Sequence, residues 1–307
     1  MKNMSKYISL TKRNCLVFLK DGASVFFSLL SMLITLVLMG VFLGNMSVET
    51  TTSLLQQYGG ERDLVLDQAN AKLLVQYWTL AGILVTNSVT VTLSVIGIMI
   101  NDAMQHRLQS FYTSPVAKSV IAFSYMSAAI IIGTLFCSVT FGISLLYIYL
   151  NGGTILSAVN ILKCMFYILL NVCIFSAMMY VIALFVQSDN AWGGLATVVG
   201  SLVGFVGAIY LPVGSLPEKI AAVLKYEPIL HGTALMRKTC CEEILAQTFA
   251  GTPEELVTSY REHMGIDIVM GGSIIKGRME IAILLGFGAV VLGVMFLVIS
   301  TRRIKER

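Results

Sequence analysis

The sequence predicts an all-α integral membrane protein with six transmembrane helices. Of its 307 residues, 56% are hydrophobic and only 12% are charged, whereas roughly 25% of the residues in an ordinary soluble domain are charged. Long uninterrupted apolar runs account for the difference, because about 20 apolar residues cross a hydrocarbon core roughly 30 Å thick. The runs are continuous and do not alternate between polar and apolar residues, which argues against a β-barrel.

Six apolar runs define the expected spans of a single membrane domain that covers residues 1–307. Each run must be helical, because hydrocarbon offers no partner to backbone N–H and C=O groups. The first run follows a basic start but is too long for the apolar part of a typical signal peptide, so we expect it to be retained. The expected spans are residues 24–43, 73–100, 120–146, 161–186, 191–211 and 279–301.

The distribution of Lys and Arg gives the expected orientation of these spans. Eleven cations and four anions lie on the side that holds both chain ends, and ten cations and thirteen anions lie on the other side. Because basic flanks of transmembrane helices stay in the cytoplasm, both termini are expected there and residues 45–72 and 212–278 are expected outside. The basic balance is thereby explained by topology and gives no reason to expect a nucleic acid partner.

The sequence contains no motif for covalent chemistry. No GxxxxGK[ST] phosphate loop, HExxH or GxSxG pattern occurs, and the three histidines (His106, His231 and His263) fall outside the expected spans. An intramembrane hydrolase needs its base and nucleophile at membrane depth, so we do not expect an enzyme. The six cysteines form no CxxC pair and are interpreted as small buried hydrophobes, not as metal ligands. The vicinal pair Cys240-Cys241 is expected to be external and to consist of free thiols.

The spans also lack the charges that ion-coupled carriers use. Lys163 lies at the outer end of the fourth run, where its stem can snorkel to the interface. Carriers driven by ions usually keep a charge near the midplane and often break their helices with Pro. All five prolines here lie outside the expected spans, so a secondary transporter is disfavoured.

The cytoplasmic segment after the second run, residues 101–115, predicts a short amphipathic helix. Asp102 suits its N-cap or first turn, and Pro115 would end it. Met104, Leu108 and Phe111 recur at helical spacing. The helix could rest on lipid headgroups, or it could be a coupling helix that docks into a cytosolic motor subunit. The expected contact residues are Asp102, Met104, His106, Arg107, Leu108, Phe111, Ser114 and Pro115.

The amino-terminal segment 8–21 is a second amphipathic stretch on the same side. Its apolar residues include Leu10, Leu16, Val17 and Leu19. We expect a helix on the lipid surface, with contact to the motor subunit as a second role. Its charged residues are Lys12, Arg13, Lys20 and Asp21.

Two polar or small-residue patterns mark a possible translocation path. Asn87, Thr90 and Ser94 form a polar stripe at helical spacing on the second span, and Asn171 of the fourth span is added to this set. Interhelical hydrogen bonding would explain the stripe equally well. Gly200 and Gly204 on the fifth span form a Gly-xxx-Gly pattern that permits close helix approach, and packing within the subunit is the simpler explanation for it.

Several short motifs follow one another in order along most of the chain. They are Tyr77-Trp78, Gly82 and Asn87; Asp102 through Ser114-Pro115-Val116; Tyr210-Leu211-Pro212, Leu216-Pro217 and Tyr226-Glu227-Pro228-Ile229; and Ala234-Leu235-Met236-Arg237. This ordered set resembles the permease subunit of the ABC type-2 transporter family. In that family a Trp and a Gly lie early in the second helix, and a coupling helix ends in Ser-Pro. External re-entrant helices between the fifth and sixth spans end near an Ala-Leu-x-Arg element.

The resemblance implies the permease half of an ATP-driven exporter in the bacterial cytoplasmic membrane. Two permeases, identical or sister subunits, would enclose a path that the second and fifth helices face. Separate nucleotide-binding subunits would dock on residues 101–115 and hold ATP and Mg, so no cofactor is expected in this chain. Drugs, peptides, lipids and glycans are all plausible cargo for the family. The uncharged spans favour an amphipathic drug, peptide or lipid-like compound.

The insert at residues 212–278 keeps an alternative open. A non-transporting receptor or immunity subunit could share this topology and use the insert as its working part. Residues 239–277 make the insert longer than two re-entrant helices require, and Thr252-Pro253-Glu254-Glu255 is a good helix start, with acids facing the dipole. The added element could gate or recognise a substrate, or it could be a solvated cap.

Overall fold

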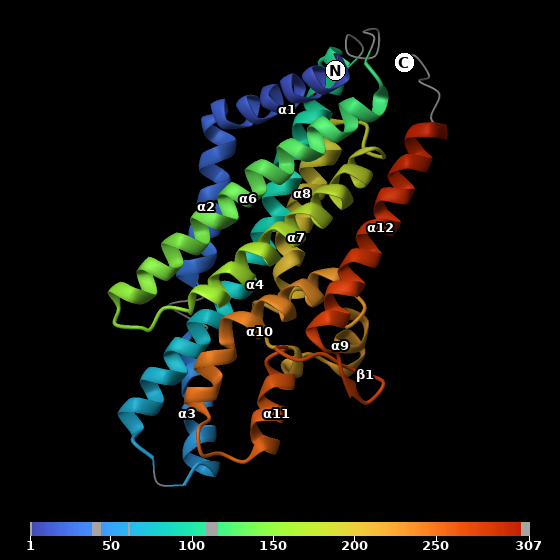
Figure 1. Ribbon diagram of the computed structural model, residues 1–307. Helices are drawn as coiled ribbons and strands as arrows, with labels where there is room; N and C mark the ends of the chain where they lie inside the picture. The colour runs from blue at the N-terminus through green and yellow to red at the C-terminus, as the bar shows by residue number, and fades with distance from the viewer. Residues whose placement is uncertain (1, 39–43, 61, 109–115, 302–307) are drawn as a thin grey trace.

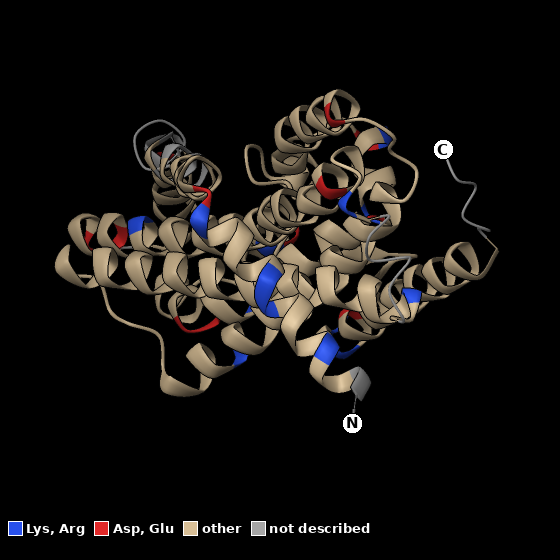
Figure 2. Ribbon diagram, turned by 90° about the horizontal axis from the view of Figure 1, so that it is seen from above, with Lys and Arg blue, Asp and Glu red and all other residues tan. Residues whose placement is uncertain are grey.

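The protein is described by a computed structural model that covers residues 2–38, 44–60, 62–108 and 116–301. It is helical apart from one short hairpin. The long helices are α1 (Lys2–Lys20), α2 (Gly22–Leu38), α4 (Leu64–Met104), α6 (Lys118–Leu150), α7 (Ala158–Ala183), α8 (Asp189–Val206) and α12 (Gly277–Thr301). Lys, Arg, Asp and Glu occupy only short stretches of otherwise uncharged ribbon (Figure 2).

Four of these helices, α4, α6, α7 and α12, are long and apolar enough to cross a membrane. They confirm a multi-pass membrane protein and coincide with the second, third, fourth and sixth expected spans. The first expected span corresponds to α2, with residues 39–43 outside the described part. The fifth corresponds to α8. The total of six spans remains a prediction.

The central helix of the bundle is α4, which packs against α6, α7, α8 and α10 (Pro228–Thr248). Its start is fixed locally, because the side chain of Asp63 accepts hydrogen bonds from the backbone N–H groups of Val65 and Leu66. At 41 residues and 1.5 Å per residue it is about 60 Å long. It is therefore about twice as long as the hydrocarbon core is thick, and it extends well beyond the expected span at residues 73–100.

The fifth expected span, residues 191–211, is wrong at its carboxyl end. Helix α8 stops at Val206 because the next residues turn the chain back: Gly207 is its C-cap, and Ala208 has a φ of 50° in the left-handed region. Residues 207–211 consequently lead out of the helix. The side chain of Ile209 then packs beside Gly82 of α4.

Helix α1 runs across one end of the bundle and meets α2 at a sharp corner (Figure 1). The corner is fixed by Asp21, whose carboxylate accepts hydrogen bonds from the backbone N–H and hydroxyl of Ser24 in the first turn of α2. The carboxyl-terminal end of α12 lies at the same end of the bundle as α1 (Figure 1).

The elements at the opposite end form what we call the outer layer. It holds the expected helix near residue 254, and it also holds a β-hairpin that was not expected. Gly271 and Gly272, with φ angles of 58° and 76°, form the turn of that hairpin. The outer layer consists of α3 (Gly44–Tyr58), η2 (Val213–Ser215), α9 (Glu218–Leu224), α10, α11 (Glu254–His263), β1 (Val269–Met270) and β2 (Ser273–Ile274).

Candidate functional site

At the α1 end of the molecule, the carboxylate of Asp102 joins three segments of the chain. Arg13 of α1 binds it through two N–H groups, one of them 2.8 Å from Oδ1, and Tyr125 of α6 donates its hydroxyl to Oδ2 at 2.6 Å. Arg107 lies 3.6 Å from Oδ1. The Asp102 side chain is 2% exposed and that of Arg13 is 28% exposed. We call Arg13, Asp102, Tyr125 and Arg107 the carboxylate joint.

The joint raises the pKa of Arg13, chiefly through its hydrogen bond to Asp102, which outweighs the partial burial of the guanidinium. Arginine is charged at any physiological pH. The guanidinium of Arg13 therefore stays charged in the joint, and only protonation of Asp102 in acid would remove the ion pair. A buried carboxylate that keeps three donors is costly to strip of any one of them.

Helix α1 is bound to α6 along its length. Tyr7 and Ser127 share a hydrogen bond, Asn14 donates to Ser124 at 3.4 Å, and Phe18 meets Phe136 edge to face with 5.9 Å between ring centroids. One face of α1 packs on protein, since it buries Thr11, Asn14 and Phe18 against the bundle. The expected place of α1 on the lipid surface stays a prediction for its other face. Leu16, Leu19, Lys12 and Lys20 remain on its exposed side.

The expected start of the coupling helix at Asp102 is wrong. Asp102 lies in the last turn of α4, which ends at Met104, and His106 breaks the helix with a φ of 58°. Residues 107 and 108 are helical again. Met104, His106 and Arg107 are exposed and Leu108 is half-buried. Phe111, Ser114 and Pro115 lie outside the described residues. Asp102 is thus turned into the protein, while its neighbours in sequence face outwards.

The polar stripe on α4 is divided between two environments. Asn87 is buried and donates to Thr140 of α6 at 3.2 Å. The hydroxyls of Thr90 and Ser94 donate to backbone carbonyls one turn earlier in α4, at 3.1 and 3.0 Å. Of the three stripe residues, Ser94 alone is exposed. Asn87 therefore helps to pack α4 on α6, and a path along this stripe remains a prediction that rests on Ser94 and Thr90.

The glycines of α8 also have separate surroundings. A Cβ on Gly200 would meet no described atom within 4 Å, whereas a Cβ on Gly204 would come 2.2 Å from the ring of Tyr210. The close approach at Gly204 is therefore made by the chain that follows α8, and not by a second helix. The face of α8 around Gly200 is exposed, with Thr197, Val198, Ser201 and Leu202 beside it.

A buried cation fixes the outer layer to α4. Arg237 of α10 is 0% exposed, and its guanidinium lies over the ring of Trp78. It donates to the carbonyls of Ala208 at 2.7 Å and Met264 at 3.2 Å, and the indole N–H of Trp78 donates to the same Met264 carbonyl at 2.7 Å. Burial lowers the pKa of Arg237 to about 9, so the guanidinium stays charged at neutral pH. Carbonyl oxygens and a π-face surround this charge.

A second ionic cluster ties the outer layer to α12. Lys238 lies 2.9 Å from Glu280 of α12 and 3.3 Å from Asp267, and Arg261 of α11 binds both oxygens of Asp267. Burial alone would raise the pKa of Asp267, but the hydrogen bonds and charges of Arg261 and Lys238 hold it below its usual value. The cluster thereby links α10, α11 and α12 through side chains that are distant in sequence.

Asn171 of α7 contacts the start of α10. Its amide donates to the carbonyl of Tyr167 at 3.0 Å, and its Oδ1 has no partner among the described residues. A Cβ on Gly232 of α10 would come 2.3 Å from that oxygen. Asn171 therefore serves the contact between α7 and the outer layer in this structure.

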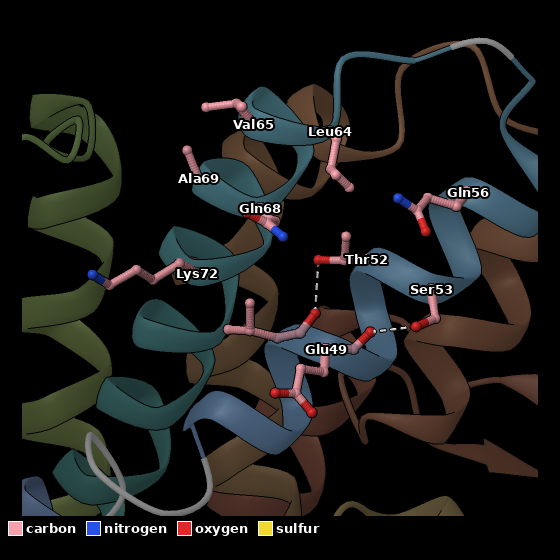
Figure 3. Close-up of a pocket in the computed structure, with 10 residues that line it drawn as sticks. Glu49, Thr52, Ser53, Gln56, Leu64, Val65, Gln68, Ala69 and Lys72 are labelled. Atoms are coloured by element: carbon pink, nitrogen blue, oxygen red, sulfur yellow. Dashed lines mark hydrogen bonds between the residues drawn. The ribbon is translucent and has the colours of Figure 1, made fainter.

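A groove of about 620 Å³ lies between α3 and the first turns of α4. Thr52 of α3 and Gln68 of α4 face one another across it, and the hydroxyls of Thr52 and Ser53 are bonded to backbone carbonyls within α3 (Figure 3). It is an open surface, and no feature of it identifies a ligand. Its lining residues are Val48, Glu49, Thr52, Ser53, Gln56, Leu64, Val65, Gln68, Ala69 and Lys72.

Comparison with known proteins identifies one family. A family model described as ABC-2 type transporter matches residues 5–240, a range that includes the carboxylate joint and both Trp78 and Arg237. Among curated proteins, none matches the chain.

Proposed function

Because the chain belongs to the ABC-2 type transporter family, whose members are transmembrane subunits of ABC transporters, we propose that it is the permease half of an ATP-driven exporter. Separate ATPase subunits would bind ATP and Mg and dock at the α1 end. This chain itself would contribute the docking surface, the path and the outer layer. No catalytic residue is assigned to it.

The observation that carries this proposal is the position of the carboxylate joint. Exposed Met104, His106 and Arg107 directly follow buried Asp102 in the chain, and Arg107 itself contacts the joint. A subunit that presses on residues 104–108 would therefore push on a carboxylate fixed to both α1 and α6. Movement at the surface would be passed to three helices at once, which is what coupling to an external motor requires.

The cargo path is proposed to lie along the exposed face of α8 and the neighbouring Ser94 of α4, where a second permease would complete it. Helices α4 and α8 pack together, and Ser94 and the residues around Gly200 are exposed. This region carries hydroxyls and apolar side chains but no charge. We therefore propose an amphipathic drug, peptide or lipid-like compound as cargo, moved outwards across the bacterial cytoplasmic membrane.

A non-transporting receptor or immunity subunit is the second candidate. The observation that favours it is the extent of the outer layer, which adds α3 and α11 beyond the pair α9 and α10. Such a subunit would also bind an ATPase at the α1 end. The two functions differ in whether ATP hydrolysis moves a compound across the membrane.

The decisive experiment is co-purification of the chain with the ATPase encoded beside it, followed by transport in vesicles. In the double variant Arg107→Glu with Leu108→Asp, the amount of bound ATPase and the rate of ATP-driven transport should each fall by more than about tenfold. The first change reverses a charge at the docking surface, and the second replaces an apolar contact with a charge. Val65→Asp with Lys72→Glu makes matched changes in the outer groove and should keep both.

The exporter proposal is wrong if the ATPase does not associate with the wild-type chain. It is also wrong if the chain alone transports the compound with an ion gradient as the driving force. Association and ATP hydrolysis without any transport would favour the receptor or immunity function.

A further inference from the structure

Two thiols from distant parts of the sequence meet inside the molecule. The sulfur of Cys164 in α7 lies 3.4 Å from the sulfur of Cys240 in α10. Both side chains are 0% exposed. The proposed transport function makes no use of either cysteine, and this pairing has no counterpart in the sequence motifs, since the two residues are separated by 76 positions.

The contact between α7 and α10 is held in place on both sides of the thiols. Towards the start of α7, Glu243 accepts a hydrogen bond from the amide of Asn160 at 2.8 Å. Towards the middle of α7, Gly232 lies directly against Asn171, because a Cβ there would come 2.3 Å from Asn171 Oδ1. The two helices are therefore antiparallel and fixed in register, and the sulfurs remain apposed.

A disulfide requires an S–S distance of about 2.05 Å, so the sulfurs need to approach by roughly 1.4 Å. The alternative partner of Cys240 is its neighbour Cys241, but adjacent cysteines rarely close a ring with each other. Cys164 is the cysteine within hydrogen-bonding distance of Cys240 among the described residues.

The pair belongs to the end of the bundle that carries the outer layer, opposite α1 (Figure 1). Helix α1, Arg107 and Lys118 carry basic residues that are expected to face the cytoplasm. In the proposed orientation, with α1 in the cytoplasm, the thiols lie on the side where disulfides form and persist. We propose that Cys164 and Cys240 are oxidised to a disulfide that fastens α10 to α7.

The oxidant belongs to the class of disulfide-containing thiol oxidants. The thiolate of Cys164 attacks a sulfur of that disulfide, and a mixed disulfide forms as the first oxidant thiolate leaves. The thiolate of Cys240 then attacks the sulfur of Cys164 and expels the second oxidant thiolate. The two protons of the cysteine thiols pass to the two oxidant thiolates, so the oxidant disulfide takes up two electrons and two protons and ends as two thiol groups. Because both thiols are buried in the closed structure, the exchange takes place before α10 closes on α7.

The test counts thiols in the full-length chain in membranes. Cells are grown in air with oxidised glutathione in the medium while the protein is synthesised. Membranes that contain the protein are then prepared. The chain is denatured and labelled with a maleimide, with and without prior reduction, and weighed by mass spectrometry. Reduction should expose two additional thiols in the wild type. It should expose none in Cys164→Ser or Cys240→Ser, and still two in the matched control Cys241→Ser.

A direct measurement on the wild type avoids any failure of a variant to fold. A non-reduced digest should contain one linked pair of peptides, bearing Cys164 and Cys240, two hydrogens lighter than the separate peptides. The proposal is overturned if reduction exposes no thiol in the wild type, or if Cys241→Ser and not Cys164→Ser abolishes the difference. Linkage between two copies of the chain would overturn it as well. None of these outcomes depends on whether the protein exports anything.

Discussion

The guanidinium carbon of Arg237 lies 4.0 Å from the ring centroid of Trp78, and both side chains donate to the carbonyl of Met264. These contacts hold together three parts of the chain: the half of α4 that contains Trp78, the middle of α10 and the turn after α11. The arrangement has no carboxylate among the described residues, so its stability depends on the cation–π contact and on hydrogen bonds to carbonyls.

The indole N–H of Trp78 is expected to contribute to stability beyond the packing of its ring. Trp78→Phe keeps a ring under Arg237 but removes one of the two donors to the buried carbonyl of Met264, which should cost about 0.5–1.5 kcal/mol. The midpoint of thermal unfolding in detergent measures this loss. The only other tryptophan, Trp192, provides the control: Trp192→Phe should lower the midpoint less. Equal losses in the two variants would contradict the assigned hydrogen bond.

The two glycines of α8 are expected to respond oppositely to a methyl group. Gly204→Ala should destabilise by about 1–3 kcal/mol through overpacking against Tyr210. Gly200→Ala should be neutral or stabilising by up to about 1 kcal/mol, since alanine is the better helix former. Unfolding midpoints of the two variants give the comparison. The second change Tyr210→Ala should relieve part of the cost at position 204, and its failure to do so would refute the close contact.

Breaking the carboxylate joint should release α1. Asp102→Asn leaves the guanidinium of Arg13 without its anionic partner, and losses of about 3–5 kcal/mol are typical of a broken buried pair. Because Arg13 is partly exposed, we expect the lower part of that range or less. Limited proteolysis of α1 should become faster in Asp102→Asn and in Arg13→Gln.

The two substitutions should not be additive, because each removes the same contact. Lys12→Gln changes an exposed neighbour of Arg13 and should leave the cleavage rate unchanged. Additive effects of Asp102→Asn and Arg13→Gln would show that the residues act independently.

Acid should loosen the outer layer through Asp267. Its pKa in the folded protein is lowered by Arg261 and Lys238 against the opposing effect of burial. A group with a depressed folded pKa contributes stability above its unfolded value, about 3.9 for Asp. That contribution is lost as the pH falls through the folded pKa. Stability of the wild type should therefore decline from about pH 5 downwards.

The variant Asp267→Asn distinguishes the effect of Asp267 from that of Glu280, because both carboxylates contact Lys238 and only one is removed. The variant should be less stable at neutral pH, and its curve should be flatter in acid. Unfolding midpoints between about pH 3 and 7 provide the measurement. If the unfolding midpoint of the wild type falls with pH in parallel with that of Asp267→Asn, Asp267 is not the source of the acid sensitivity.

The four helices that are long and apolar enough to cross a membrane were predictable from the sequence, because a continuous apolar run has no alternative to a helix inside hydrocarbon. The expected run at residues 279–301 became α12 with almost the same limits, and helix α11 starts where the Pro-Glu-Glu signal placed it. The end of α8 was missed because apolar residues continue past Val206, and only the left-handed conformation at Ala208 shows that the helix has stopped.

The joint was beyond sequence analysis for a different reason. Asp102 carries a local pattern that is typical of a helix start, and nothing near it reveals that Arg13, 89 residues earlier, binds its carboxylate. Trp78 and Arg237 could be recognised in the sequence as parts of motifs, but the contact between their side chains could not be predicted from it. The same applies to Cys164 and Cys240, since side chains brought together by helix packing leave no spacing pattern in the chain.

Helix α4 carries Trp78 about a third of the way along its length and Asp102 in its last turn, 24 positions or about 36 Å of uninterrupted helix apart. A rod of that kind cannot tilt at one end without tilting at the other. Thermodynamic reciprocity then applies to its two ends. If docking of an ATPase near Asp102 alters the outer layer, any ligand that favours one arrangement of the outer layer must change the affinity of the ATPase by the same factor. An antibody fragment against α11 would for that reason report on the state of a subunit that it never touches.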